Sequence, residues 1–185
     1  WGDHFPNREQ LFEHFMSNFR YGTVLIEEKV PGEESSCMGF CDGKHFVTLP
    51  DTRDYKRAFD DDYGPNTGGM GAVSPVPFAD AELMKKIEER VIKPTVLGLQ
   101  QEGLEYRGFI FFGFMIVKNE PYMIEYNCRM GDPETEVVIP RLKNDLVELF
   151  AAVSRQQLDT IKIETDPRTV CTVVAVSGGY PGEYK

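Results

Sequence analysis

The sequence predicts an α+β fold in which helices flank an antiparallel sheet. Two pairs of apolar runs indicate the sheet, one pair joined by Asp42-Gly43 and the other by residues 118–121. Short connections of this kind are typical of β-hairpins, whose strands pair antiparallel. Other segments repeat apolar residues at helical spacing, so we expect helices to cover the sheet.

The first elements follow from a helix cap and from short apolar runs. Asn7 and Gln10 resemble a capping box, which predicts a helix over about Arg8–Phe19. Apolar residues recur at helical spacing along it, namely Leu11, Phe12, Phe15, Met16 and Phe19. Three strands are expected next, over Thr23–Glu27, Ser36–Asp42 and His45–Leu49.

Residues 51–77 are expected to form a long loop, because charges, glycines and prolines interrupt any apolar period there. Long loops in compact domains tend to be functional. Asp80 then begins a helix that should cover the sheet, since apolar residues recur on one of its faces. Pro94 predicts a kink in this helix, and Gly103 predicts its end.

The second half of the chain contains its most apolar hairpin, with strands expected over Gly108–Val117 and Tyr122–Tyr126. Asp132 and Pro133 suit the N-cap and first turn of the next helix. A further amphipathic helix is expected over Asp145–Gln157 and a strand over Val170–Val176. The chain stops soon afterwards in a glycine-rich turn, so we expect an excerpt from which neighbouring domains are truncated.

Composition excludes several classes of protein. The 185 residues are 41% hydrophobic, enough for one or two small domains with a core. No apolar run approaches the roughly 20 residues that a transmembrane helix needs, and the first ten residues lack the layout of a signal peptide. We therefore expect no membrane association and a cytoplasmic location. The four cysteines are scattered, which predicts reduced, packed thiols instead of a zinc site or disulfides.

The formal net charge of −10 argues against nucleic-acid binding, which needs clustered cations. It does not argue against a nucleotide, because metal ions offset carboxylates locally at nucleotide sites. The oligomeric state is not predicted.

The most informative segment closes the second hairpin. In a strand, Glu125, Asn127 and Arg129 would point to one face, because side chains two apart share a side. Carboxylate and amide oxygens suit Mg²⁺, and a guanidinium suits a phosphoryl oxygen. The alternative is a strand whose exposed face happens to be polar.

Residues 64–71, GPNTGGMG, contain four glycines, which are costly to order and need a compensating reason. Glycines allow backbone N–H groups to converge on an anion. The segment lacks the Lys-Ser/Thr of a Walker loop and does not follow a strand as a Rossmann fingerprint does. A merely flexible loop is the alternative. Just upstream, Lys56 and Arg57 could reach a phosphate or belong to a solvated loop tip.

Residues 26–34, IEEKVPGEE, join a strand to a turn and a second strand. Free backbone groups at such a crossing can pair with a purine edge, and a later carboxylate can accept bonds from a ribose. The alternative is a surface hairpin with solvated glutamates. The three histidines fall in no ligand spacing, so nucleophilic catalysis is not indicated.

Together these segments resemble the glycinamide ribonucleotide synthetase family, the phosphoribosylamine–glycine ligases of purine synthesis within the ATP-grasp superfamily. The matching motifs run in the family's order from about Val24 onward, namely IEEKVPGEES, DYKRAF, GPNTGGMGAVSP, IEYNCRMGDPETE, LKNDLVELF and SGGYPGEY. The resemblance implies an ATP-grasp core in which residues 1–27 end the lid subdomain, 28–165 form the catalytic core and 166–185 begin a truncated C-terminal domain.

The resemblance also implies a role for each matching residue. Glu27, Glu28 and Val30 would read adenine. Glu34 would hold the ribose, and Lys56 would lie near the terminal phosphates and act in catalysis. Glu125 and Asn127 would ligate Mg²⁺ or Mn²⁺, and Arg129 would steady the transferring phosphoryl group. The residues that would border the amine and glycine are Asn66, Thr67, Gly68, Gly69, Met70, Gly71, Asp132, Pro133 and Glu134.

The implied reaction joins glycine to 5-phosphoribosylamine. ATP would phosphorylate the glycine carboxylate, and the amine would displace phosphate to give glycinamide ribonucleotide, ADP and phosphate. The strand before Glu125 carries Gly113 where many ATP-grasp enzymes have a further acidic metal ligand. The excerpt is expected to be inactive alone. Two alternatives stay open: another ATP-grasp carboxylate–amine ligase, or a nucleotide-binding module without catalysis.

Overall fold

The computed structural model describes residue 5 and residues 7–19, 22–23 and 25–183. The chain divides into two compact units, Trp1–Pro31 and Gly32–Lys185. Their placement relative to one another is not determined. Each unit is therefore described by itself.

The first unit contains helix α1, Arg8–Asn18. Its start is the expected one, because the side chain of Asn7 accepts a hydrogen bond of 3.0 Å from the N–H of Gln10. The strand expected over Thr23–Glu27 is wrong for the described residues 23 and 25–27, which form no strand. A β-branched, apolar run forms a strand only where another strand pairs with it.

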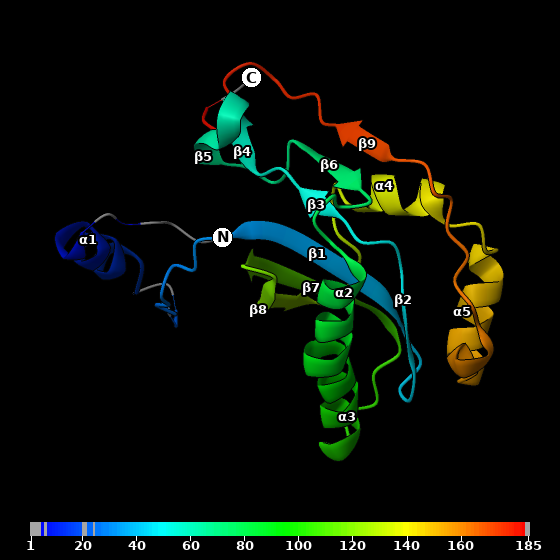
Figure 1. The fold of residues 1–185 in the computed structure, drawn as a ribbon. Coiled ribbons are helices and arrows are strands. Elements are labelled where there is room, and N and C mark those ends of the chain that lie inside the picture. Colours follow the sequence, from blue (N-terminus) through cyan, green and yellow to red (C-terminus); the bar gives the residue numbers. More distant parts are fainter. Residues whose placement is uncertain (1–4, 6, 20–21, 24, 184–185) are drawn as a thin grey trace. The chain divides into compact units, whose positions relative to one another are not determined.

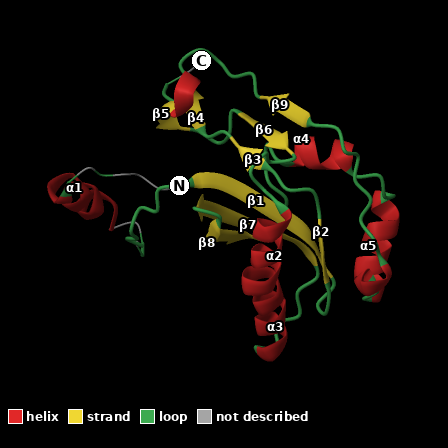
Figure 2. Ribbon diagram, viewed as in Figure 1, coloured by secondary structure: helices red, strands yellow, loops and turns green. Residues whose placement is uncertain are grey.

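The second unit is built on a four-stranded antiparallel sheet, shown in yellow in Figure 2. The strand order is β2 (Phe46–Thr48), β1 (Glu33–Cys41), β7 (Gly108–Val117) and β8 (Glu120–Asn127). Both expected hairpins are present. β1 pairs with β2 across the Asp42-Gly43 turn, and β7 pairs with β8.

The expectation that residues 51–77 form one long loop is wrong. It contains β3 (Arg53–Asp54), β4 (Arg57–Phe59), β5 (Tyr63–Asn66) and β6 (Gly71–Ser74), with a 3₁₀ turn over Asp60–Asp62. β6 lies between β3 and β9 (Val170–Val173) in a three-stranded antiparallel sheet, and β4 pairs with β5. Strands this short show no period, and β9, one partner of β6, lies about 100 residues later in the sequence.

Helices cover both faces of the four-stranded sheet (Figure 1). On one face, Phe112 and Phe114 pack against Leu83 and Ile87 of α2 (Ala81–Ile87) and against α3 (Lys93–Gln101). Between these helices lies a π-helical turn, Glu88–Ile92, in which Lys93 N–H donates to the carbonyl of Glu88. The irregular turn immediately precedes Pro94, which has no N–H to continue the α-helical ladder.

The opposite face packs against α4 (Thr135–Val138) and α5 (Leu146–Arg155), with 3₁₀ turns over Ile139–Arg141 and Leu158–Thr160. The helices expected to begin at Asp80 and Asp145 are present, and both carboxylates accept helix N–H groups as N-caps. The expected N-cap at Asp132 is wrong. α4 begins at Thr135 with Glu134 in the N-cap position, and residues 132–134 form a turn before it.

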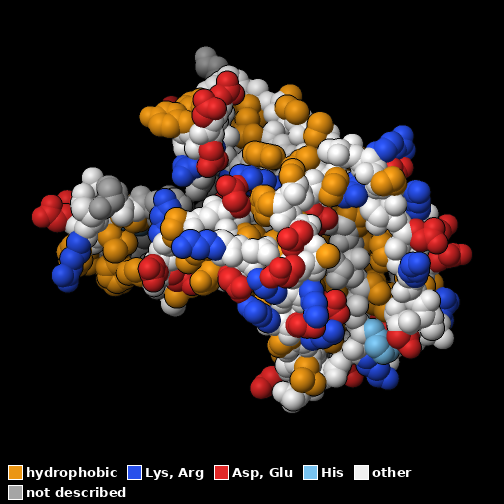
Figure 3. All heavy atoms as spheres, viewed as in Figure 1, with side chains coloured by type: hydrophobic (Ala, Val, Ile, Leu, Met, Phe, Trp, Pro, Cys, Tyr) orange, Lys and Arg blue, Asp and Glu red, His pale blue; other side chains and the backbone are white. Residues whose placement is uncertain are grey.

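All four cysteines are free thiols. Cys37 and Cys41 are packed in the core as expected, and burial raises the pKa of the Cys37 thiol to about 12. Cys128 and Cys171 are exposed, so the expectation of packing is wrong for these two. No helix among the described residues is long and apolar enough to cross a bilayer. On the face shown in Figure 3, the described acidic and basic side chains are interspersed.

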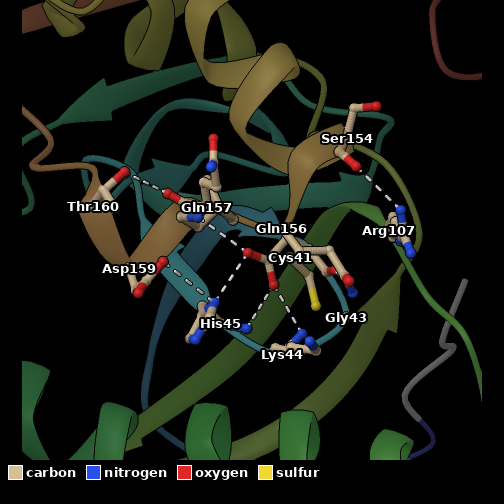
Figure 4. A network of polar contacts seen from close by, with 12 residues as sticks. Cys41, Gly43, Lys44, His45, Arg107, Ser154, Gln156, Gln157, Asp159 and Thr160 are labelled. Atoms are coloured by element: carbon tan, nitrogen blue, oxygen red, sulfur yellow. Dashed lines mark hydrogen bonds and ion pairs between the residues drawn. The ribbon is translucent and has the colours of Figure 1, made fainter.

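Asp42 locks the β1–β2 hairpin to the turn after α5. Its fully buried carboxylate accepts hydrogen bonds from the N–H groups of Lys44 (2.8 Å), His45 (2.7 Å) and Leu158 (3.1 Å). His45 Nδ1 lies 3.1 Å from the same carboxylate, and the Gln156 side chain donates to the Asp42 carbonyl (Figure 4). The network fixes the end of the sheet away from Glu34.

Asp42→Ala is expected to lower the free energy of unfolding by about 2–4 kcal/mol, because the lost acceptor leaves buried N–H groups unpaired. Burial acts to raise the pKa of Asp42, but the hydrogen bonds more than offset it and hold the pKa below 3.8. The stabilisation is therefore present above about pH 4 and is lost as the pH falls through the folded-state pKa. Urea unfolding at several pH values measures both effects.

Asp159→Ala is the control, because this exposed carboxylate lies 3.9 Å from the same His45. Equal losses in the two variants would contradict the role of Asp42.

Candidate functional site

One face of the four-stranded sheet is apolar at one end and polar at the other. Met38 and Phe40 of β1 pack under α4 and α5, whereas Glu34 and Ser36, on the same side of the strand, lie towards its start. Ser36 pairs with Gly113 of β7, which in turn pairs with Glu125 of β8. The polar end of this face therefore brings together residues from three strands.

Lys56 lies between β3 and β4, and its ammonium forms an ion pair of 3.2 Å with the carboxylate of Glu34. Both side chains are roughly half exposed. Burial acts to lower the pKa of Lys56, but the ion pair with Glu34 and the charges of Asp54 and Glu125 raise it above its ordinary value. Lys56 is thus a stable cation beside three carboxylates.

The segment of residues 66–71, here called the glycine loop, is joined to the segment that carries Lys56. Thr67 donates from both its N–H (2.8 Å) and its hydroxyl (2.9 Å) to the carbonyl of Lys56. Met70 N–H donates to the carbonyl of Tyr55, and Tyr55 N–H donates to the carbonyl of Gly71. These bonds hold Lys56 and the glycine loop in one position.

The glycines of the loop differ in how strongly the structure requires a residue without a side chain. Gly69 has φ of +125°, and a Cβ there would overlap Pro133 Cδ and lie 3.0 Å from Asp54 Oδ1. Gly71 has no positive φ, but a Cβ there would overlap the carbonyl oxygen of Thr172 in β9. Gly68 has neither constraint, since the nearest atom to an added Cβ is Tyr180 Oη at 3.4 Å. Gly69 is therefore the position in this loop that most needs glycine.

The C-terminal segment contacts the same loop. β9 pairs with β6 immediately after the loop, and Val174 N–H donates to the carbonyl of Met70. Gly68 N–H donates to the hydroxyl of Tyr180 at 3.0 Å. Residues 170–180 thus support the loop from the side of β6.

Glu125 and Asn127 lie side by side on β8, as the alternation predicts, and Asn127 Nδ2 donates to Glu125 Oε1 at 3.1 Å. Arg129 does not continue the alternation, because β8 ends at Asn127. Its guanidinium donates to the carbonyl of Met130 at 2.7 Å, and its charge acts on Glu134. The structure therefore brings Arg129 to the site from the turn after the strand.

The donor set at Glu125 and Asn127 fits a divalent ion. Among the described residues, no group of three His, Cys, Asp or Glu side chains is placed to hold a metal ion. One carboxylate and one amide oxygen on an open strand end are what a Mg²⁺ ion needs when phosphate oxygens and waters complete its octahedron. Gly113 lies beneath Glu125, with an added Cβ 3.2 Å from Glu125 Cγ. The strand before Glu125 therefore places no acidic ligand at this point.

The turn over residues 132–134 closes the site on the side of α4. Pro133 and Glu134 are buried, whereas Asp132 is exposed. Ser36 Oγ donates to Glu134 Oε1 at 3.4 Å. Burial raises the pKa of Glu134, although a bond to its own N–H and the charges of Lys56 and Arg129 act in the opposite direction. Glu134 thus ties the turn to the polar end of the sheet.

Asp54 is a site residue that the sequence reasoning missed. It is 8% exposed, and its Oδ1 atom has no hydrogen-bond partner among the described residues. Burial, followed by the charge of Glu134, raises the pKa of Asp54 to about 7, while Lys56 acts in the opposite direction. The available signal was its position two residues before Lys56, in the same short polar segment.

Glu27, Glu28 and Val30 lie in the first unit, outside any helix or strand. The structure does not place them relative to the residues above. A separate hollow of about 710 Å³ is lined by residues of β2, α3 and the turns on either side, including Phe46, Val96 and Leu158, and it contains none of the candidate site residues.

The comparisons with known proteins agree with the resemblance. A family model for the ATP-grasp (A) domain of phosphoribosylglycinamide synthetase matches residues 7–135. A phosphoribosylamine–glycine ligase of Clostridium acetobutylicum is 45% identical over 161 residues, which are 87% of this chain and 39% of that protein. The trifunctional purine biosynthetic protein adenosine-3 of Homo sapiens is 45% identical over 163 residues, 88% of this chain and 16% of that protein.

Among solved structures, the crystal structure of phosphoribosylamine–glycine ligase from Thermotoga maritima matches with a TM-score of 0.75 and 40% identity. The match covers 86% of this chain and 40% of that chain. This chain therefore spans about two fifths of the length of the single-function ligases it matches. It belongs to the phosphoribosylglycinamide synthetase family and carries that family's ATP-grasp fold.

Proposed function

We propose that the full-length protein is an ATP-dependent ligase that joins glycine to 5-phosphoribosylamine, giving glycinamide ribonucleotide, ADP and phosphate. The observation that carries the proposal is the convergence of Lys56, the glycine loop, Glu125–Asn127 and the 132–134 turn at one end of the sheet, in a chain of this family. Its relatives are named for this reaction.

The residues of the site suit phosphoryl transfer to a carboxylate. Lys56 and Arg129 supply positive charge to the transferring group, which needs positioning and charge neutralisation more than a covalent nucleophile. A Mg²⁺ or Mn²⁺ ion held by Glu125 and Asn127 would neutralise charge on the phosphate oxygens. Glycine would become an acyl phosphate, and the amine would then attack its carbonyl carbon and release phosphate.

Adenine would be read by Glu27, Glu28 and Val30, and the ribose would be held by Glu34. A ribose hydroxyl on the Glu34 carboxylate would compete with the ion pair to Lys56, which would free the ammonium for the phosphates. The glycine and phosphoribosylamine sites would be bordered by Asn66–Gly71 and by Asp132–Glu134. The assignment of residues 28–165 to the catalytic core stays a prediction, as does the cytoplasmic location.

The function is tested by supplying the full-length protein with ATP, Mg²⁺, glycine and phosphoribosylamine. We expect phosphate release that requires all four, and a product with the mass of glycinamide ribonucleotide. Turnover with a different carboxylic acid or amine in place of these substrates would favour another ATP-grasp ligase. Binding of ATP without any turnover would favour a nucleotide-binding module.

Glu34→Ala is expected to raise the KM for ATP about tenfold with a smaller change in kcat. A ribose contact is made equally in the ground and transition states, so its loss weakens binding uniformly. Initial rates at varied ATP measure both constants. Glu33→Ala is the matched control, because this neighbour points to the other side of β1 and pairs with Arg53 at 2.5 Å. A large fall in kcat at saturating ATP, with KM unchanged, would contradict the ribose role.

A further inference from the structure

The hollow beside β2 lies along an open edge of the four-stranded sheet. β2 is the outermost strand on this side, and both Phe46 and Thr48 line the hollow. Leu49 N–H donates to the carbonyl of Met38 in β1 at 2.8 Å, and backbone direction alternates along an antiparallel strand. The N–H and C=O groups of Phe46 and Thr48 therefore point away from β1. Among the described residues, none hydrogen-bonds these outward groups.

Two apolar walls flank this edge, one over each face of the sheet. One wall is α3, whose Val96 packs in the same core cluster as Phe112. The other is the segment of residues 158–163, whose Leu158 and Ile161 pack with Phe40 on the opposite face. The hollow has a volume of about 710 Å³, within the roughly 300–1,000 Å³ of ligand pockets. A flat ring in the plane of the sheet would contact apolar side chains above and below.

The lining also carries positive charge without a partner, in a chain whose formal net charge is −10. Its acidic side chains already lie beside cations. Glu88 pairs with Lys93 at 2.9 Å, and Asp159 lies 3.9 Å from His45 (Figure 4). The other cations of the lining are two exposed lysines that form no ion pair with a described carboxylate, Lys44 and Lys162. Their ammonium groups suit an anionic group such as a phosphate.

We propose that the hollow binds a purine nucleoside monophosphate, at a site separate from the candidate functional site. The base lies between the two walls with its edge against β2, where the free N–H and C=O groups pair with the acceptors and donors of the heterocycle. The phosphate lies at the rim, where Lys44 and Lys162 supply positive charge. No candidate site residue lines the hollow, so the inference does not depend on the proposed function.

Two other ligand classes fit the same hollow less well. An aliphatic acid would satisfy the apolar walls and the lysines, but it would leave the outward backbone groups of β2 without partners. A pyrimidine nucleotide would pair with those groups, but its single ring covers less of the two walls than a purine does. The combination of walls, strand edge and cations therefore favours a purine with one phosphate.

The test uses the full-length protein with Mg²⁺ and a saturating non-hydrolysable ATP analogue, so that a catalytic nucleotide site is already filled. Equilibrium dialysis with labelled AMP should then show one further nucleotide bound per chain. Adenosine and ribose 5-phosphate should each bind at least about tenfold more weakly, because each lacks one of the two recognised groups. The proposal is overturned if no further nucleotide binds, or if ribose 5-phosphate or UMP binds as tightly as AMP.

Lys44→Ala and Lys162→Ala should each raise the Kd for AMP about tenfold, the size expected for the loss of one charge-assisted contact. Both side chains are exposed, so the fold should not change. Lys118→Ala is the matched control, because it removes an exposed lysine from the β7–β8 turn, outside the hollow. AMP binding that is the same in all three variants would place the nucleotide elsewhere and overturn the assignment.

Thr48→Pro tests the contact between the base and the strand edge. Proline removes one outward N–H of β2 but no hydrogen bond of the β1–β2 ladder, and edge strands tolerate proline in this orientation. We expect the Kd for AMP to rise about fivefold, as for one lost neutral hydrogen bond. Thr48→Ala keeps the N–H and should bind AMP like the wild type. Equal affinity in Thr48→Pro and Thr48→Ala, with both folded by thermal unfolding, would contradict the pairing of the base with β2. If Thr48→Pro does not fold, the two lysine variants decide the proposal.

Discussion

Glu125→Gln and Asn127→Leu should each lower kcat for amide formation by about 10²–10³-fold, the range seen when one preorganised charge-stabilising group is lost. Each substitution removes one of the two oxygen ligands proposed for the divalent ion, at a strand end that needs neither side chain for its pairing. β8 is held by its ladder to β7 and by Met123, which is partly buried and packs against the core. The expected change in the thermal unfolding midpoint is therefore small.

The measurement is steady-state turnover at saturating ATP and varied Mg²⁺, together with thermal unfolding of each variant. Glu120→Gln is the matched control, because it removes a carboxylate from the same strand where the partners are Lys86 and Arg90. Surface ion pairs of this kind contribute little, and these partners lie away from the candidate site, so its kcat should stay close to that of the wild type. Wild-type activity with Mg²⁺ in both site variants would contradict the proposal that Glu125 and Asn127 bind the metal ion.

Gly69→Ala should slow amide formation by about 10²-fold, the size of loss that a displacement of roughly 1 Å causes in a positioned site. The new Cβ would overlap Pro133, crowd Asp54 Oδ1 and adopt a φ of +125°, which is unfavourable for alanine. The loop would have to shift away from the 132–134 turn. ATP binding should change much less, because the residues proposed to read adenine lie in another segment.

Gly68→Ala provides the comparison for this prediction. It changes the neighbouring glycine to the same residue, but its Cβ would meet only Tyr180 Oη at 3.4 Å. We expect a much smaller loss of amide formation. Equilibrium binding of an ATP analogue and steady-state synthesis separate the two effects in both variants. Equal rates for Gly69→Ala and the wild type would show that the glycine loop only connects β5 to β6 and does not position the substrates.

The elements predicted correctly from the sequence are those that depend on local chemistry. Asn7, Asp80 and Asp145 cap helices through N–H groups two or three residues ahead, and Asp42-Gly43 defines a tight hairpin. The short strands between 53 and 74 could not be predicted in the same way. β6 exists because β9, about 100 residues later, pairs with it, and no local period records such a partner.

The same distinction applies to the candidate site. The alternation of Glu125 and Asn127 is visible in the sequence because a strand has a period of two. The environment of Asp54 comes from burial and from the approach of Gly69 and Glu134, which only the folded chain brings about. The alternation predicted for Arg129 is wrong, since this residue follows the strand instead of belonging to it.

The pairing of β9 with β6 bears on how this core can be prepared in isolation. A polypeptide ending at residue 165 would lack β9 and leave the N–H and C=O groups along one side of Gly71–Ser74 open to any other strand. Uncovered edges of this kind promote aggregation between copies. It would also remove Tyr180, the hydroxyl that accepts from Gly68. An expression boundary placed after residue 180 keeps β6 paired with β9, and with it the support beneath the glycine loop.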